Sequence, residues 1–463
     1  MNESNTTHQL VASLRAEIAG LSSGARLPSA RELVHRHGVS PVTVTRAYAL
    51  LAAEGLVVTR PGSGTFVAGR RPGRGPAPGD TSWQALALGD RSVDTARVSQ
   101  MLGPPPPGSI TMSGGYLHRS LQPARALAAA LARASRRPDA WDRAPAEGLP
   151  ALRAVFARTA GVDPDDVLIT GGGQGALSTA FRAIAAPGDR VLVESPTYPG
   201  ALSAARAAGL RPVPVPLDAD GVRPESLAEA FAMTGARLLY CQPAFHNPTG
   251  TVLAAERRRQ VVDVARAVGA FVLEDDFARL LGHGRPLPPS LVSDDRDGVV
   301  VYATSLTKAS SPSLRIGALV ARGPVMARLR AMRLVDDFFI ARPLQEAAIE
   351  LLSSPAWDRH LRALAAALRE RCATLAAALA EHLPGWQVAQ IPAGGLHLWA
   401  RTGRLGHVAE AARRHHVAID PGRDFFAAEA PGDFVRLNFA AAANLTELAD
   451  GVRRLRAAMD DAP

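Results

Sequence analysis

The chain has 463 residues, 47% of them hydrophobic, which is typical of a globular protein with about two to four domains and a sizeable core. It contains no apolar run of about 18 residues, and its first residues, MNESNTTHQL, lack the regions of a signal peptide. We therefore expect no transmembrane helix, no secretion and no membrane partner. Two cysteines, Cys241 and Cys372, are too few for a disulfide framework, which favours a reducing cytoplasm.

Positive charge is concentrated near the N-terminus. The formal net charge is +9, and residues 1–74 contain nine arginines, four glutamates and no lysine or aspartate, an excess of five in about a sixth of the chain. Such a local excess is typical of a DNA-binding domain, because contacts to phosphates supply much of the affinity for DNA.

The basic residues themselves are unusual in kind. Of 52 basic residues 51 are arginine, and Lys308 is the only lysine. Coding bias accounts for arginine on the surface, where it can replace lysine. A guanidinium cannot form a Schiff base, however, so a lone lysine in such a chain is a candidate for covalent chemistry.

Residues 8–68 are predicted to form a compact helical domain that ends in a hairpin. Apolar spacing predicts a first helix over Leu10–Ile18. A capping box at Ser29 and Glu32 opens the second helix, and Ser40 with Pro41 opens the third. Further signals complete the order of a winged helix-turn-helix: helix ends near Gly38 and Gly55, and strands near Leu56–Thr59 and Thr65–Val67 around the turn Pro61-Gly62-Ser63-Gly64.

This order predicts which side chains meet DNA. The third helix should enter the major groove with Thr43, Thr45 and Arg46 on its exposed face. The remaining candidates are helix openings, which suit phosphate, and the glycine wing, which suits the minor groove: Ser29, Arg31, Ser40, Arg60, Gly62 and Gly64. The alternative is a helical unit that mediates only protein contacts, which the agreement of charge, helix order and wing disfavours.

The segments LPSARELV, GVSPVTVTRAYALLAAEGL and RPGSGTFV resemble the DNA-binding head of the GntR family across residues 8–68. Many members carry a basic residue directly after the Ser or Thr that begins the recognition helix, where this chain has Pro41. The resemblance therefore implies binding to a double-stranded DNA operator, but the operator sequence cannot be taken from relatives.

Residues 69–109 are predicted to be a semi-rigid linker, because they contain GRRPGRGPAPGD and GPPPPG around a short helical stretch near Trp83–Leu88. From residue 110 to 463, apolar strands alternate with helices rich in alanine, leucine and arginine. This alternation predicts an α/β domain with a mainly parallel sheet. The expected strands include Val167–Thr170, Arg190–Glu194, Arg237–Cys241, Phe271–Glu274 and Val299–Ala303.

Several reactive or anion-binding residues follow these strands. Lys308 comes just after Val299–Ala303, and Arg315 seven residues later can clamp a phosphate. Ser305 and Thr307 add hydroxyl groups beside the lysine. A strand, glycine turn and helix start at Gly171-Gly172-Gly173-Gln174 also suits phosphate, although a plain turn needs no ligand.

Four more residues complete the set, each with an ordinary alternative. Tyr198 can stack on a flat ring or fill a core, and Asn247 can bind a ring hydroxyl or shape a turn. Asp275 can hold a pyridinium proton or cap a helix, and Arg436, inside an apolar run, can pair with a ligand carboxylate or with a protein group. Together they supply the amine, acid, phosphate cradle, stacking ring and amide that pyridoxal 5'-phosphate (PLP) requires.

The order of these motifs, above all HNPTG and TK followed by Pro312 and Arg315, resembles fold-type-I aminotransferases over residues 110–455. A GntR head joined to such a body is similar to the MocR subfamily of bacterial regulators. The resemblance implies a smaller C-terminal α/β subdomain, a head-to-tail, domain-swapped homodimer, and no metal. It also implies roles for residues: Lys308 forms the internal aldimine, Asp275 faces the pyridine nitrogen, Asn247 lies near the ring hydroxyl, Tyr198 stacks, Gly172, Gly173, Gln174, Ser305, Thr307 and Arg315 hold phosphate, and Arg436 receives an effector's carboxylate.

Two departures from that pattern bear on activity. Phe277 stands where relatives commonly have tyrosine, and Gly173 stands where serine is usual. Both losses weaken the case for efficient turnover more than the case for cofactor binding. We therefore favour a regulator that responds to PLP or to a PLP-reactive amine or amino acid, with vitamin B6 homeostasis as the preferred setting and residual transaminase activity left open. The alternatives are an active aminotransferase with an appended DNA-binding domain, and a body that has lost the cofactor and only dimerises.

Overall fold

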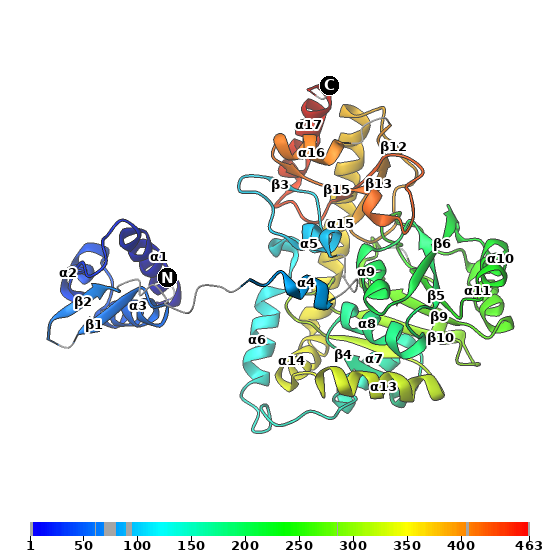
Figure 1. Cartoon of the computed structure of the whole chain (residues 1–463), viewed down its shortest axis with the longest axis horizontal. Helices are drawn as coiled ribbons and strands as arrows, with labels where there is room; N and C mark the ends of the chain where they lie inside the picture. Colours follow the sequence, from blue (N-terminus) through cyan, green and yellow to red (C-terminus); the bar gives the residue numbers. More distant parts are fainter. Residues whose placement is uncertain are drawn as a thin grey trace. The chain divides into compact units, whose positions relative to one another are not determined.

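The computed structural model describes residues 3–60, 62–68, 80–88, 95–284, 286–403 and 407–461. The chain divides into two compact units, Met1–Ser92 and Val93–Pro463 (Figure 1). Residues 69–79 and 89–94 of the expected linker, and Pro61 of the expected wing turn, lie outside the described residues. Within the linker range the structure has two short helices, α4 (Trp83–Leu88) and α5 (Ala96–Leu102), and α5 belongs to the second unit.

The first unit has the winged helix-turn-helix order that the sequence predicts. Three helices, α1 (Glu3–Ala19), α2 (Ala30–His37) and α3 (Pro41–Ala53), precede the antiparallel strands β1 (Val57–Arg60) and β2 (Gly64–Val67). One core joins the three helices, and it includes the fully buried Leu14, Leu33 and Leu51. The first helix begins seven residues earlier than its apolar spacing indicates, since its first turns carry polar residues.

Local capping sets the helix boundaries of this unit. Ser29 accepts a hydrogen bond from the backbone of Glu32, whose carboxylate accepts one from the Ser29 backbone, which is the reciprocal capping box. Gly38 ends α2 in the left-handed conformation with φ of 61°, which a glycine adopts without steric cost. Ser40 then caps α3 by accepting from the Thr43 amide.

The second unit is built on an eight-stranded sheet. Its strands are parallel except for the two that run antiparallel to their neighbours, β11 and β7. This mainly parallel sheet confirms the predicted fold class. In sheet order the strands are β4 (Val167–Thr170), β11 (Gly317–Val320), β10 (Val300–Ser305), β9 (Phe271–Asp276), β8 (Leu238–Cys241), β5 (Arg190–Ser195), β6 (Arg211–Asp218) and β7 (Gly221–Val222).

Helices cover both faces of this sheet, which explains why its central strands contain runs of buried apolar residues. One core cluster joins the sheet to α8 (Gly173–Ile184), α9 (Pro199–Ala207) and α13 (Pro324–Asp337). A second cluster lies on the other face, with α7 (Pro150–Ala160), α10 (Pro224–Thr234), α11 (Ala255–Ala267), α12 (Leu291–Asp294) and α14 (Arg342–Leu352). Helix α6 (Ala124–Ala134) packs against α14.

A smaller C-terminal subdomain completes the unit, as expected. Its four-stranded antiparallel sheet has the order β12 (Gln387–Val388), β13 (His397–Arg401), β16 (Phe434–Asn438) and β15 (Asp420–Pro421). It packs with α15 (Pro355–His382), α16 (Val408–Arg414) and α17 (Leu445–Asp460). A parallel pair of β3 (Ile110–Thr111) and β14 (Val417–Ala418) ties the start of the unit to this subdomain.

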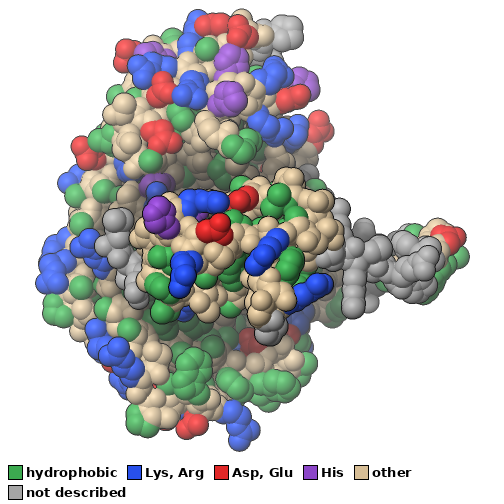
Figure 2. Space-filling model, turned by 90° about the vertical axis from the view of Figure 1, so that its left-hand side faces the viewer, with side chains coloured by type: hydrophobic (Ala, Val, Ile, Leu, Met, Phe, Trp, Pro, Cys, Tyr) green, Lys and Arg blue, Asp and Glu red, His purple; other side chains and the backbone are tan. Residues whose placement is uncertain are grey.

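The surface carries mixed charge. In Figure 2 arginine, acidic and histidine side chains are intermingled at the top of the face shown. Among the described residues, no helix combines the length and apolar character that a bilayer crossing would require.

Candidate cofactor site and DNA-reading head

One pocket of the second unit lies at the carboxyl ends of parallel strands. Asp275 is the next-to-last residue of β9, Gln242 directly follows β8, and Lys308 comes three residues after β10. Since parallel strands place their carboxyl ends at one edge, residues distant in sequence meet there. The pocket brings together predicted residues from every motif: Tyr198, Asn247, Asp275, Gly173, Gln174, Ser305, Thr307, Lys308, Arg315, Arg436 and also Phe277.

Lys308 is held in this pocket by contacts with the start of the second unit. Its Nζ donates a hydrogen bond of 2.8 Å to the carbonyl oxygen of Gly115 and lies 4.1 Å from the centroid of the Tyr116 ring. Burial, then the positive charge of Arg436, lower the pKa of Lys308 to about 7. A large fraction of its amine is therefore uncharged near neutral pH, as a nucleophile that attacks an aldehyde must be.

Asp275 lies in the same pocket with one oxygen uncommitted. Tyr240 and Gln242 donate hydrogen bonds of 2.7 and 2.8 Å to its Oδ2. Within the described part of the chain, Oδ1 has no hydrogen-bond donor. Burial raises the pKa of Asp275 to about 6, against the two hydrogen bonds, which lower it. The carboxylate can thus accept a further proton donor such as a pyridinium nitrogen.

Backbone and side chains form an anion cradle beside the lysine. Helix α8 begins after Gly172, which has φ of 85° and supplies no capping side chain, so its first amides remain available. Arg315 donates a hydrogen bond of 2.6 Å to the Gly171 carbonyl oxygen. A Cβ at Gly172 would lie 2.9 Å from the guanidinium carbon of Arg315. Ser305 and Thr307, whose hydroxyls are 3.0 Å apart, line the other side.

Tyr198 is oriented by the adjacent turn. It precedes α9, and its hydroxyl donates 3.2 Å to Oε1 of Gln174, whose amide donates to the Gly200 carbonyl. A Cβ at Gly200 would lie 2.3 Å from the tyrosine ring, so only glycine leaves room for the ring. Burial raises the pKa of Tyr198, which keeps the ring neutral.

Asn247 and Arg436 both line the pocket and are hydrogen-bonded to each other. Nη1 of Arg436 donates a hydrogen bond of 2.9 Å to Oδ1 of Asn247. The side-chain nitrogen Nδ2 of Asn247, a residue that lines the pocket, has no acceptor among the described residues. Arg436 also binds Asp420, at 2.6 Å from Nη2 to Oδ2. The arginine expected to meet a ligand carboxylate is paired with a protein carboxylate in this structure.

These observations show that the pocket fits PLP. It holds the only lysine of the chain, a carboxylate with a free oxygen, an uncapped helix start beside an arginine, and an amide donor. The two departures from the family pattern, Phe277 and Gly173, also line this pocket. Phe277 borders the pocket and offers no hydroxyl, and a Cβ at Gly173 would meet only the Ser305 Cβ, at 3.5 Å.

Sequence reasoning missed part of the lining. Met101 and Leu102 lie in the range assigned to the linker, and Tyr116 and His397 carried no recognised motif, yet all four border the pocket. Gln242 could have been found, because it directly follows the predicted strand Arg237–Cys241, as Asp275 directly follows the predicted strand Phe271–Glu274. Met101 and Leu102 belong to α5, which packs on α9, and His397 belongs to β13 of the C-terminal subdomain, so tertiary packing decides their positions.

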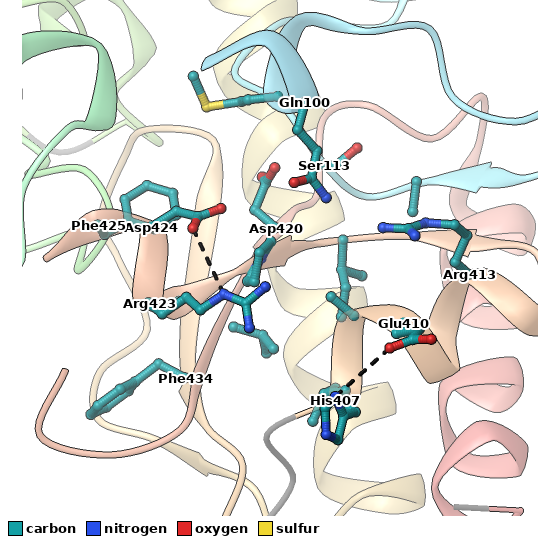
Figure 3. A pocket seen from close by; sticks show the side chains of 18 of the residues that line it. Gln100, Ser113, His407, Glu410, Arg413, Asp420, Arg423, Asp424, Phe425 and Phe434 are labelled. Carbon is teal, nitrogen blue, oxygen red and sulfur yellow. Dashed lines mark ion pairs between the residues drawn. The ribbon is translucent and has the colours of Figure 1, made fainter. Parts of the chain in front are cut away.

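A larger cavity of about 860 Å³ lies next to this site. Figure 3 shows its polar side chains, including Gln100, Ser113, Asp420 and Arg423, and the aromatic Phe434. It contains no lysine, because Lys308 lines the smaller pocket. Only the smaller pocket therefore offers a lysine that could form a Schiff base, and it shares the lining residue Met101 with the larger cavity.

The head presents most of its predicted DNA-contacting residues on the surface. Arg46 and Thr45 of α3 are exposed, and the Thr45 hydroxyl donates 3.0 Å to the Pro41 carbonyl. The others are also exposed or half-exposed: Ser29, Arg31, Ser40, Arg60, Gly62 and Gly64. Arg60 lies over the ring of Phe66, with its guanidinium carbon 5.2 Å from the centroid.

The prediction that Thr43 is exposed was wrong. Thr43 is buried on the side of α3 that carries Ala47 and Leu51, one and two helical turns further on. Its hydroxyl is 2.8 Å from that of Ser40, so it supports the helix cap. Val42, at 74% exposure, takes the outward position next to Pro41.

Comparisons with known proteins agree with both parts. Residues 112–455 match the family described as aminotransferase class I and II, and residues 6–67 match bacterial regulatory proteins of the gntR family. The chain is 30% identical to the uncharacterized HTH-type transcriptional regulator YdcR of Escherichia coli, over 93% of this chain and 94% of that protein. It is 29% identical to the probable rhizopine catabolism regulatory protein MocR of Rhizobium meliloti, over 90% and 87%.

A solved structure resembles the second unit. It is LysN, an α-aminoadipate aminotransferase from Thermus thermophilus complexed with N-(5'-phosphopyridoxyl)-L-leucine, with a TM-score of 0.76 and 30% identity over 82% of this chain and 98% of LysN. The full-length regulators share both parts of this chain, and LysN shares the body with its PLP fold. The chain therefore belongs to the MocR subfamily of GntR-type regulators, with a DNA-binding head and a PLP-dependent aminotransferase-like domain.

Proposed function

We propose that the protein binds PLP through a Schiff base with Lys308 and that the state of this site controls how the protein binds its DNA operator. The observation that carries the proposal is the environment of Lys308. It is the only lysine, its pKa is lowered to about 7 by burial, and it lies in a pocket with Asp275 and the anion cradle.

Each neighbour has a defined task in this proposal. When bound, PLP supplies an aldehyde that condenses with an amine and a ring that withdraws electrons. Oδ1 of Asp275 holds the proton at the pyridine nitrogen, and the Asn247 amide donates to the ring hydroxyl. Tyr198 stacks on the ring. The first amides of α8, with Ser305, Thr307 and Arg315, bind the phosphate.

The proposed output is a change in DNA binding. PLP, alone or with a small amine or amino acid, shifts the body between conformations that space two heads of a head-to-tail homodimer differently. Such a regulator acts in the cytoplasm, where the operator is. Vitamin B6 homeostasis is the setting we favour, because a site that keeps its main cofactor-binding residues but lacks a hydroxyl at Phe277 and a side chain at Gly173 suits a sensor of the cofactor itself.

Operator binding by the full chain, with and without PLP, tests this proposal. We expect PLP to change operator affinity or the spacing of protected half-sites for the unmodified chain. The Lys308→Arg variant keeps a long basic side chain but cannot form the Schiff base, so its DNA binding should not respond. Identical DNA binding by the unmodified chain in both states would refute the sensing role.

A second candidate function is an active aminotransferase whose head tethers it to DNA. It is supported by the similarity to the aminotransferase LysN across the whole body and by the presence of every main cofactor-site residue in one pocket. Steady production of keto acid from an amino acid and a keto-acid acceptor, at many turnovers per site, would favour this function. A single half-turnover without recycling would favour the sensor.

A further inference from the structure

Arg436 has almost no hydrogen-bonding capacity left for a ligand. Nε and Nη2 both donate to Oδ2 of Asp420, at 3.1 and 2.6 Å, and Nη2 also donates 2.9 Å to the Gly114 carbonyl. Nη1 donates 2.9 Å to Asn247. Only one of its five N–H groups has no acceptor within the described residues. A carboxylate that binds an arginine in the bidentate manner needs two free N–H groups.

Asp420 is built into this position. It lies on β15, directly opposite Arg436 of β16 in the sheet register, and both side chains are buried. The Gly114 amide also donates 2.9 Å to Asp420 Oδ2. Gly114 is itself fixed, because its carbonyl accepts from His397 and Asn438 as well as from Arg436. The carboxylate is therefore held by a rigid backbone amide and by the arginine.

The pair of Arg436 and Asp420 lies between the cofactor pocket and the larger cavity. Arg436 borders the cofactor pocket, whereas Asp420 borders the larger cavity, where Figure 3 shows it near Ser113. An aspartate that approaches the guanidinium from outside the cofactor pocket can neutralise it without filling the space beside Lys308. The pocket thus keeps room for a ligand, but Arg436 does not offer a free positive charge for its carboxylate.

We propose that Asp420 is a specificity-determining residue that makes the site select primary amines lacking an α-carboxylate over α-amino acids. This inference rests on the proposed function, since it concerns the ligand of the same site. An α-carboxylate that reached Arg436 would come close to the buried Asp420 carboxylate, and repulsion between like charges is strong away from water. An amine without the carboxylate avoids that repulsion.

The covalent step is a simple exchange. The amine nitrogen of the ligand forms the bond to the aldehyde carbon of PLP as the bond from Lys308 Nζ to that carbon breaks. Lys308 leaves as a free amine, and the protons lost by the ligand are gained by the lysine. No oxidant, reductant or further reactant is needed, and the carboxylate of an amino acid takes no part in it.

A matched pair of ligands tests the proposal on the PLP-loaded full chain. Alanine and ethylamine differ only by the carboxylate, and their exchange with Lys308 is followed by the change in the Schiff-base absorption band. We expect ethylamine to bind the unmodified chain about tenfold or more tighter than alanine. In Asp420→Asn we expect alanine to bind about tenfold tighter than before and ethylamine to change by less than about threefold.

Two further measurements make the test specific. Propionate, which carries a carboxylate but no amine, should bind more tightly to Asp420→Asn than to the unmodified chain by calorimetry. Glu410→Gln is the control, because it removes one negative charge from the rim of the same larger cavity without touching Arg436. It should leave all three affinities unchanged. If Asp420→Asn fails to fold, Asp420→Ser takes its place.

Several outcomes would overturn the inference. One is tighter binding of alanine than of ethylamine by the unmodified chain, which decides the matter even if both variants fail to fold. Another is an equal change for both ligands in Asp420→Asn. Exchange with neither ligand would also overturn it, although a normal PLP band and PLP-dependent operator binding would then leave the proposed function standing. Loss of the PLP band from the unmodified chain would instead remove the proposed function itself.

Discussion

The hydroxyl of Tyr240 donates a hydrogen bond of 2.7 Å to Oδ2 of Asp275 inside the sheet. Tyr240 is in β8 and Asp275 in the adjacent parallel strand β9. The bond, with that from Gln242, favours the charged form of a carboxylate whose pKa burial raises to about 6. Tyr240 thus positions Asp275 and supports its ionisation without reaching the pocket itself.

Tyr240→Phe should therefore weaken PLP binding. Losing a hydrogen bond to a charged group costs about 1.5–3 kcal/mol, and the pKa of Asp275 should rise further, so less of it is ionised at neutral pH. We expect PLP affinity to fall about tenfold or more, measured by titration of the Schiff-base band. Tyr302→Phe is the control, because that buried tyrosine donates to Asp276 instead. Equal losses in both variants would contradict the assigned role of Tyr240.

The rate at which PLP reacts with Lys308 should depend on pH near neutrality. The pKa of Lys308 is lowered to about 7 by burial and by the charge of Arg436. Only the uncharged amine attacks the aldehyde, so the rate should rise as pH increases through about 7 and then level off. Stopped-flow measurements on the PLP-free chain test this. A rate that keeps rising in proportion to hydroxide up to pH of about 10, as for an ordinary lysine, would contradict it.

Two adjacent glycines of the anion cradle should respond in opposite ways. Gly172→Ala places a side chain on a residue with φ of 85° and its Cβ 2.9 Å from the Arg315 guanidinium, so we expect PLP affinity to fall about tenfold or more. Gly173→Ser adds a hydroxyl where the nearest atom to its Cβ is 3.5 Å away. We expect equal or tighter PLP binding from the added donor. Weaker binding by both variants would show that the cradle tolerates no side chain.

Arg46 should contribute to operator binding through phosphate or base contacts. It is exposed on α3, so Arg46→Ala should weaken operator binding and reduce the slope of log affinity against log salt by about one. Arg15→Ala is the matched control, because it also removes one exposed positive charge but one already paired with Glu54 at 2.8 Å. Equal effects of the two variants would show that net charge, not the position of Arg46, matters.

Much of the candidate site could be predicted because it depends on short segments. Lys308 and Asn247 follow apolar strands and Asp275 lies at the end of one, and parallel strands bring such ends together whatever the details of packing. The helix caps of the head, such as Ser29 with Glu32 and Ser40, involve residues within three positions of each other. Local patterns of this kind are readable without the fold.

Other features depended on contacts that no local pattern contains. Thr43 was predicted on the exposed face of its helix, yet packing of α3 against the rest of the head turns it inward. Met101 and Leu102 follow a proline- and glycine-rich segment and still line the cofactor pocket. Their position results from packing of α5 within the second unit, which composition alone does not reveal.

The sequence by itself determined the two-part architecture, the family and the lysine that can carry the cofactor, because these rest on strand and helix periods, capping residues and the chemistry of a lone amine. Only the tertiary structure decided what Arg436 meets. Asp420 lies 16 residues away along the chain, and the pairing of β15 with β16 places it opposite the arginine. A buried charge takes whichever partner the fold brings within reach, and that choice follows from sheet register, not from sequence proximity.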